Sequence, residues 1–270
     1  MKKLSTILIV SVIALFTGNL FAQGAYVNIN AGYGFSMSSQ NIDGFYNETS
    51  GSNSSTIEQV NVSLGKGLNF GGTFGFMFND NVGAELGVSY LMGGKATAKD
   101  EYTGGTTDYT MSSNMLRFIP SVVIAAGTDG IDPYAKFGVI VGSGSIKYDY
   151  EDVDDGDIGI MKKKMNGGMA LGLNAAIGAN FEISDFMSFF AEINMVNMSY
   201  APTKGEVTEA TYNGVDMLPN LTTSDKEVEF VDSYTRNYEN PPSDSQPSQE
   251  LKTKYPFGSV GVNVGLRIDL

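Results

Sequence analysis

The clearest hydrophobic pattern in the chain runs from Gly67 to Met92. Its first half sets five apolar side chains against small or polar residues in a two-residue repeat: Leu68, Phe70, Phe74, Phe76 and Phe78 against Asn69, Gly71, Thr73 and Gly75. Residues 79–81 then form a turn, and the alternation resumes from Val82 to Tyr90. This period predicts two antiparallel strands. Because the phenylalanine face needs an apolar surrounding and the glycine-rich face suits a narrow interior, the pattern favours a small barrel whose outside contacts lipid.

The same alternation recurs along the rest of the chain. It predicts eight strands, each close to the ~10 residues that cross a membrane at a tilt, at about 25–36, 57–78, 82–90, 116–124, 133–146, 169–182, 189–195 and 260–270. Short connections alternate with long ones: 79–81, 127–132 and 183–186 against about 38–59, 93–112, 147–167 and 201–255. Every long connection therefore leaves from the same rim. We predict an all-β fold, an eight-stranded antiparallel up-and-down transmembrane β-barrel with long extracellular loops.

Some local features refine this prediction. Pro120 lies inside the fourth strand, and because a closed barrel has no free edge, we expect a bulge there. Gly104 and Gly105 are expected to form a hairpin tip that lengthens the third and fourth strands. The Ser- and Asn-rich residues 36–55 and the proline-containing residues 237–249 are expected to be mobile segments without a core of their own.

The N-terminus has the layout of a secretory signal peptide. Lys2 and Lys3 precede an apolar run from about Leu4 to Phe16, which is too short to span a bilayer, and the segment ends at Ala22. We therefore expect residues 1–22 to be cleaved and residues 23–270 to form the barrel. The alternative is that residues 1–22 are retained as an anchor. Since the chain contains no cysteine, neither a disulfide framework nor a lipoprotein anchor is expected.

Composition limits the chemistry that is open to the chain. With 0 His and 0 Cys, it lacks a Ser-His pair, a cysteine nucleophile and the usual zinc ligands, so we expect neither an enzyme nor a cofactor. Without Lys2 and Lys3, the 17 basic residues become 15 against 30 acidic ones, a net charge of −15. Such an acidic chain is expected to bind neither nucleic acid nor anionic lipid headgroups as direct partners.

Taken together, these features resemble the eight-stranded outer-membrane β-barrel superfamily, in particular the OmpX-like and OmpA-barrel-like proteins with an outer membrane protein β-barrel domain. The residues that carry the resemblance are the signal peptide, the glycine-alternating strand at 69–78, the turn at 79–81 and the alternating C-terminal strand at 257–270. The chain departs from the family in ending on Leu270, where Phe or Trp is usual, and in lacking Trp. The resemblance implies a bacterial outer-membrane location, with outer-membrane lipid and lipopolysaccharide as surroundings. It also implies that the long loops contact a surface partner or a larger outer-membrane complex.

The alternation places six charged side chains on the interior face: Glu85, Arg117, Lys136, Glu182, Glu192 and Arg267. Arg117 belongs towards the outer rim, where it could pair with loop acids, and the others belong near the periplasmic end. Because side chains fill an eight-stranded barrel, we expect opposite charges to pair and block flow, as in the resembling OmpA-type barrels. The alternative is individually hydrated charges around a thin column of water.

An acidic run follows the fifth strand: Asp149, Glu151, Asp152, Asp154, Asp155 and Asp157. It does not fit the EF-hand pattern, because Gly156 is out of position. The run predicts either a solvated acidic loop or a loose divalent-cation site. The neighbouring lysines at 162–164 could contact lipopolysaccharide phosphates or neutralise these acids.

Two classes of function remain open from the sequence. The first is a structural or surface-interaction barrel with a lumen plugged by charges. The alternative is a narrow porin-like channel for small solutes, which would resemble the OmpW-like proteins.

Overall fold

The computed structural model describes residues 24–236, 238 and 242–270. The predicted signal peptide at 1–22 lies outside the described residues, and so does part of the segment predicted to be mobile at 237–249. Within the described ranges, no helix is long and apolar enough to cross a membrane.

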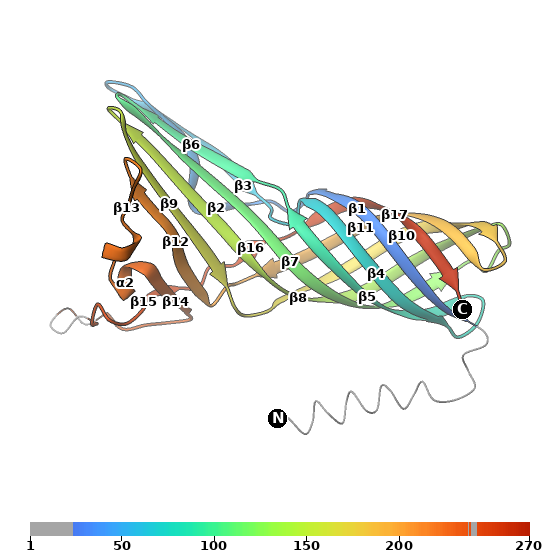
Figure 1. Ribbon diagram of the computed structural model, residues 1–270. Helices are drawn as coiled ribbons and strands as arrows, with labels where there is room; N and C mark the ends of the chain where they lie inside the picture. Colours follow the sequence, from blue (N-terminus) through green and yellow to red (C-terminus); the bar gives the residue numbers. More distant parts are fainter. Residues whose placement is uncertain (1–23, 237, 239–241) are drawn as a thin grey trace.

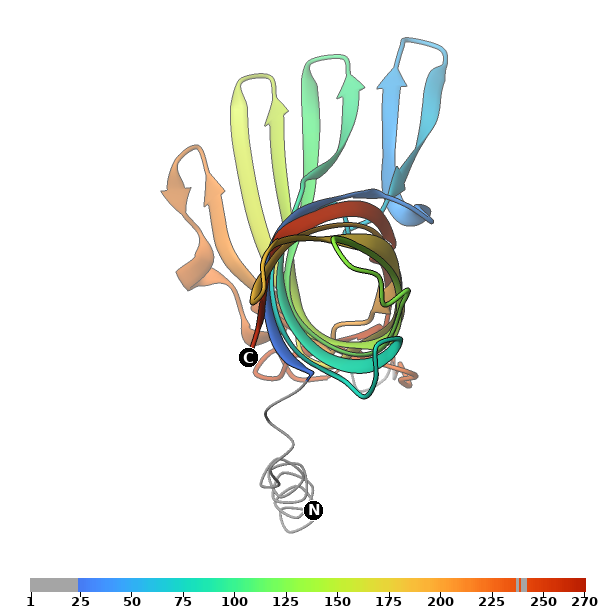
Figure 2. The same cartoon turned by 90° about the vertical axis from the view of Figure 1, so that its right-hand side faces the viewer.

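Eight strands close into a barrel by antiparallel pairing of each with the next: β1 (Ala25–Ser36), β4 (Gly67–Met77), β5 (Val82–Gly93), β7 (Gly105–Ala125), β8 (Ile131–Asp154), β10 (Ala170–Ser184), β11 (Met187–Tyr200) and β17 (Ser259–Asp269). The circle closes where β1 pairs with β17, from Tyr26 opposite Asp269 to Ser36 opposite Ser259. Figure 2 shows the closed barrel end-on. The predicted eight-stranded antiparallel barrel is confirmed.

The two faces of the barrel strands differ as the alternation predicts. Outward side chains are apolar and exposed, for example Leu86 at 52%, Phe137 at 59% and Ile177 at 64%. Polar residues on the opposite phase, such as Asn28 and Arg117, are each 4% exposed and face the interior. An apolar exterior around a polar interior is the arrangement that lipid requires of a barrel.

Short turns and both described chain ends lie at one end of the barrel (Figure 1). At the first turn, the side chain of Asn79 accepts hydrogen bonds from the amides of Asn81 and Val82, at 2.9 Å each. At 126–130, the Asp132 side chain accepts from the amide of Gly127 at 2.8 Å. These asparagine and aspartate contacts hold the turns by the mechanism that favours such residues there.

The predicted long loops are largely strands. β2 (Gln40–Ser50) pairs with β3 (Ser55–Val62), so the prediction of a mobile segment at 36–55 is wrong. β6 (Ala96–Tyr102) pairs with the upper part of β7 around Gly104, whose φ of +97° suits only glycine well. The predicted hairpin tip at Gly104 and Gly105 is therefore confirmed. The second predicted strand is interrupted at 63–66, because β3 pairs with β2 whereas β4 pairs with β1 and β5.

Further strands continue this sheet: β9 (Asp157–Asn166), β12 (Lys204–Tyr212), β14 (Glu227–Val231) and β15 (Ser248–Leu251). The sheet above the rim thus runs β3-β2-β6-β7-β8-β9-β12-β14-β15, and we call it the extension sheet. The smaller elements are β13 (Val215–Asp216), η1 (Leu218–Asn220), α2 (Thr223–Lys226) and β16 (Tyr255–Pro256). Seen along the barrel, the hairpins of the extension sheet reach to one side, well beyond the outline of the barrel (Figure 2).

Pro120 does not produce the predicted bulge. On one side it lies opposite Leu86, in an unbroken register between β5 and β7. On the other side, the pairs of Phe118 with Val141 and of Ser121 with Gly138 keep one register, and only Ile119 and Pro120 lack partners. Proline has no backbone N–H to donate. Here two residues of β7 are left without partners on β8, and no extra residue is inserted.

Candidate functional site in the barrel lumen

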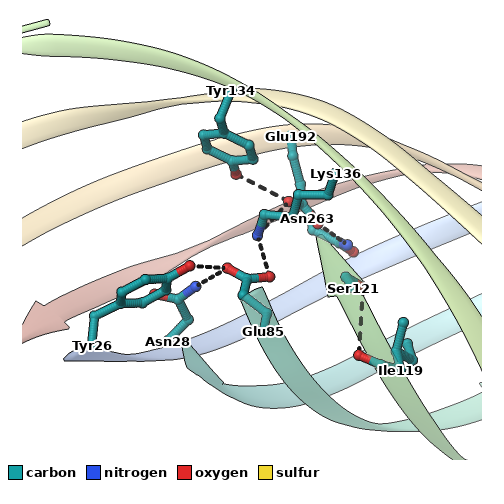
Figure 3. A network of polar contacts seen from close by, with 9 residues as sticks. All are labelled: Tyr26, Asn28, Glu85, Ile119, Ser121, Tyr134, Lys136, Glu192 and Asn263. Carbon is teal, nitrogen blue, oxygen red and sulfur yellow. Dashed lines mark hydrogen bonds and ion pairs between the residues drawn. The ribbon is translucent and has the colours of Figure 1, made fainter. Parts of the chain in front are cut away.

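In the lumen, a lysine lies between two carboxylates (Figure 3). The Nζ of Lys136, on β8, is 3.1 Å from Glu85 Oε2 on β5 and 3.3 Å from Glu192 Oε2 on β11. The three side chains are 11%, 6% and 9% exposed. We call these three residues the lysine cluster. It joins strands that are not neighbours in the sheet, because β7 separates β5 from β8 and β10 separates β8 from β11.

Neutral donors add further hydrogen bonds to both carboxylates. Tyr26 donates its hydroxyl hydrogen to Glu85 Oε1 at 2.7 Å, and Asn28 Nδ2 approaches the same oxygen at 3.4 Å. Glu192 accepts from the Tyr134 hydroxyl at 3.0 Å and from Asn263 Nδ2 at 2.9 Å. Buried ion pairs are tolerated when their remaining polar atoms are satisfied in this way.

Aromatic rings surround the charges. Lys136 Nζ lies 4.7 Å from the centre of the Tyr134 ring and 5.6 Å from that of Phe190. The Arg267 guanidinium lies 3.8 Å from the centre of the Tyr26 ring. Cations stacked on ring faces gain electrostatic attraction where water is scarce. The rings therefore stabilise both cations and narrow the lumen at this level.

The structure brings together three of the six predicted lumen residues, and the other three lie apart from them. Arg267 pairs with Asp269 on its own strand, at 2.8 Å. Glu182 is exposed at the turn end, where it accepts from the Gly130 amide at 3.0 Å. Arg117 lies further towards the outer rim, as expected from its distance to the turn.

Arg117 has neutral partners. Its Nε donates to Ser89 Oγ at 3.1 Å, and its Nη2 donates to Asn69 Oδ1. Among the described residues it forms no ion pair, so the pairing with loop acids that the sequence left open is absent. Arg117 is thus a buried cation whose nearest partners are uncharged.

A cavity of about 70 Å³ is lined by both Arg117 and the lysine cluster. Most of its other lining is polar: Asn30, Asn69, Thr73, Ser89, Ser121, Asn174, Asn194 and Asn263. A polar space of this size can hold several water molecules, since one water needs roughly 10 to 15 Å³. We call this polar cavity, which has room for water, the hydrated chamber. The formal charges of its lining are one net negative charge in the lysine cluster and one positive charge at Arg117.

Above the chamber, the interior face changes from polar to apolar. Leu91, Met115 and Ile140 are each 0% exposed and Val196 is 1% exposed, on β5, β7, β8 and β11. They belong to one packed cluster, which Leu64 and Phe257 join from connecting segments. We call the four strand residues the apolar layer. This layer was not predicted from the sequence, although Leu91, Met115 and Ile140 share the interior phase of Glu85, Arg117 and Lys136.

Tyr200 and Phe257 fix the outer end of this cluster. Their ring centres are 6.0 Å apart in an edge-to-face arrangement. The Tyr200 hydroxyl lies 2.9 Å from the Gly144 carbonyl oxygen and 2.8 Å from that of Gly167. The hydroxyl thereby joins the upper part of β8 to the segment that precedes β10.

The acidic run at 149–157 is distributed over both faces of the hairpin of β8 and β9. Asp149 and Glu151 alternate with Asp152 and Asp154, so the strand period turns them to opposite faces. Asp152 accepts hydrogen bonds from Tyr102 and Thr107, at 3.1 and 2.7 Å.

Asp155 and Asp157 lie at the tip of the same hairpin. Asp157 accepts from Tyr212 and Asn213, which lower the pKa of its carboxyl. Over the described ranges, no group of three or more acidic side chains is arranged to hold a metal ion. The divalent-cation site therefore stays a prediction without a built site.

Comparisons with known proteins identify the family of the chain. The sequence matches the family described as "Outer membrane protein beta-barrel domain" over residues 8–217. No curated protein matches the chain. Among solved structures, the fold is similar to that of Neisserial surface protein A (NspA), at 11% sequence identity and a TM-score of 0.38, covering 92% of this chain and 98% of that one. It is also similar to Acinetobacter baumannii CarO, at 12% identity and a TM-score of 0.32, covering 93% of this chain and 99% of that one. The family match extends over most of the sequence, and the chain therefore belongs to the outer membrane protein β-barrel family of the bacterial outer membrane.

Proposed function

We propose that this barrel is a non-conducting membrane anchor that displays the extension sheet at the cell surface, where the sheet contacts a surface partner or a larger outer-membrane complex. The observation that carries the proposal is the succession of two barriers along one lumen. The lysine cluster crosses the interior near the periplasmic end, and the fully buried apolar layer crosses it near the outer end.

Each barrier opposes a different kind of flow. Ion pairs with satisfied carboxylates resist the entry of ions, because separating them leaves a buried charge unpaired. A dry apolar constriction excludes water itself, as hydrophobic gates do. The hydrated chamber between the two barriers then stores water without conducting it.

The proposal also assigns no enzymatic activity. Glu85 and Glu192 are the paired carboxylates of the interior, and both are held by the same lysine and by neutral donors. A general acid or base needs a free path to a substrate proton. Carboxylates that are enclosed between rings and an apolar layer do not offer one.

Liposome swelling tests the closed lumen. Vesicles that contain the wild-type protein should swell in arabinose or glycine no faster than protein-free vesicles. The positive control is the same barrel with Leu91→Gly, Met115→Gly and Ile140→Gly, combined with Lys136→Gly, which removes both barriers. Swelling of the wild-type vesicles at the rate of the positive control would establish the narrow channel instead.

A further inference from the structure

Three lysines form a row at the base of the extension sheet, on the face that continues the outside of the barrel. Lys147 on β8 lies opposite Ser112 on one side and opposite Lys164 on the other. Lys95 immediately precedes Ala96, whose partner Met111 is the neighbour of Ser112. We call Lys95, Lys147 and Lys164 the basal lysine row.

The basal lysine row forms no ion pairs within the described chain. All three side chains are exposed, and none forms an ion pair with a described residue. Lys147 and Lys164 are directly opposite like charges, an arrangement that destabilises a sheet unless an anion compensates it. Glu206 lies opposite Lys164 but forms no ion pair with it.

Two lysines further along the same face of β6 and β9 behave differently. Further from the barrel, Lys162 pairs with Glu209 at 2.7 Å and Lys99 pairs with Glu101 at 2.9 Å. Along β6, β8 and β9, the outward-facing lysines that lack an ion pair are thus those nearest the barrel. An external anion at that level would account for the difference.

The height of the basal lysine row relative to the hydrocarbon region follows from the outward residues of β7. Leu116 and Phe118 are 40% and 45% exposed and belong to the apolar exterior. Ser112 lies four residues beyond Leu116, or roughly 10 Å higher at 3.3 Å per residue and a barrel tilt near 40°. This places the row in the headgroup region just outside the hydrocarbon. The extension sheet is inclined to the barrel, and its hairpins reach to one side beyond the outline of the barrel (Figures 1 and 2).

We propose that the basal lysine row binds the phosphate groups of outer-leaflet glycolipid. An ammonium group offers three donors and a full charge to a phosphate oxygen. Strands about 4.8 Å apart present these groups as a line, with the Ser112 hydroxyl as a further donor. The contact would fix the orientation of the overhanging sheet on the membrane surface. It is independent of whether the lumen conducts.

The test compares two triple variants of the full-length barrel in detergent micelles. One carries Lys95→Gln, Lys147→Gln and Lys164→Gln. The matched control carries Lys99→Gln, Lys162→Gln and Lys252→Gln, which removes the same charge from lysines that have acidic partners. Titration with bisphosphorylated lipid A, followed by native mass spectrometry, measures binding, and circular dichroism verifies that both variants are folded.

We expect the first variant to bind the lipid roughly 100-fold more weakly than wild type, at about five-fold per lysine near a membrane surface. The control should stay within about three-fold of wild type, and dephosphorylated lipid A should bind wild type as weakly as the first variant binds the phosphorylated lipid. An equal loss in both variants, or equal binding of both lipids, would overturn the proposal. Displacement of the lipid by equimolar inorganic phosphate would also overturn it, in favour of a site for free phosphate.

Discussion

Lys136 and Glu85 form an ion pair at 3.1 Å although β7 lies between their strands in the sheet. Through Glu192 the same lysine also reaches β11, beyond β10. The lysine cluster therefore ties together parts of the barrel that share no backbone hydrogen bonds. Its contribution to stability should be visible when the charges are removed one at a time and then together.

We expect Lys136→Met to lower the free energy of unfolding by about 3 to 5 kcal/mol, because it leaves two buried carboxylates without their cation. Adding Glu85→Gln and Glu192→Gln to this variant should restore most of the loss, since no unpaired charge then remains. Urea unfolding in micelles, followed by circular dichroism, measures both effects. If the single variant costs nothing, or the triple variant recovers nothing, the cluster is not a coupled unit.

Arg117→Met should behave differently. Arg117 is as buried as the lysine cluster, but no ion pair offsets the cost of removing its charge from water. Its replacement should therefore change the free energy of unfolding by less than about 1 kcal/mol. The same unfolding experiment provides the comparison. A loss as large as that of Lys136→Met would show that Arg117 is coupled to the carboxylates through the water of the chamber.

Much of the fold is legible in the sequence because a strand period of two separates lipid-facing from interior residues. Which of the interior charges pair with one another was less predictable. The alternation places Lys136 and Glu85 inside, but their relative height depends on the stagger between strands, which the pattern does not encode. Arg267 illustrates this limit, since it pairs with Asp269 on its own strand and not across the lumen.

Other features were missed for different reasons. β2 is rich in polar residues and lacks a clear alternation, so it forms a strand through its pairing with β3 and not through its own pattern. The apolar layer did have a signal, because Leu91, Met115 and Ile140 break the small and polar interior phase. The acidic run at 149–157 was recognisable from its charge. The two-residue period of the strand, however, turns its side chains to opposite faces.

The free-energy cost of placing an arginine on the lipid-facing exterior should depend on its depth in the membrane. Leu86→Arg, near the middle of β5, should cost about 2 to 4 kcal/mol, whereas Ile124→Arg, near the turn end of β7, should cost no more than about 1 kcal/mol. Both side chains are outward and exposed, at 52% and 59%. Refolding yield and unfolding in lipid vesicles give the comparison. Equal costs at the two depths would contradict a membrane-spanning exterior.

Glycines in the lumen phase should be intolerant of a methyl group where strands and rings crowd them. In Gly265→Ala, the new Cβ would collide with the Ile29 carbonyl oxygen and the Phe190 ring, so we expect a loss of about 1 to 3 kcal/mol. Gly72→Ala is the control, because its Cβ would meet nothing closer than the Asn28 carbonyl oxygen at 3.4 Å. Heat-dependent gel migration and urea unfolding measure both variants, and the prediction fails if Gly72→Ala is the more damaging.

The central claim is that two barriers in series close the lumen, and the current through a planar lipid bilayer tests it most directly. The wild-type protein should give no steady single-channel conductance, and removal of either barrier alone, by Lys136→Gly or by Leu91→Gly with Met115→Gly and Ile140→Gly, should give little. Removal of both should produce long-lived openings. A large, steady conductance of the wild-type protein would contradict the closed lumen and identify the barrel as a channel.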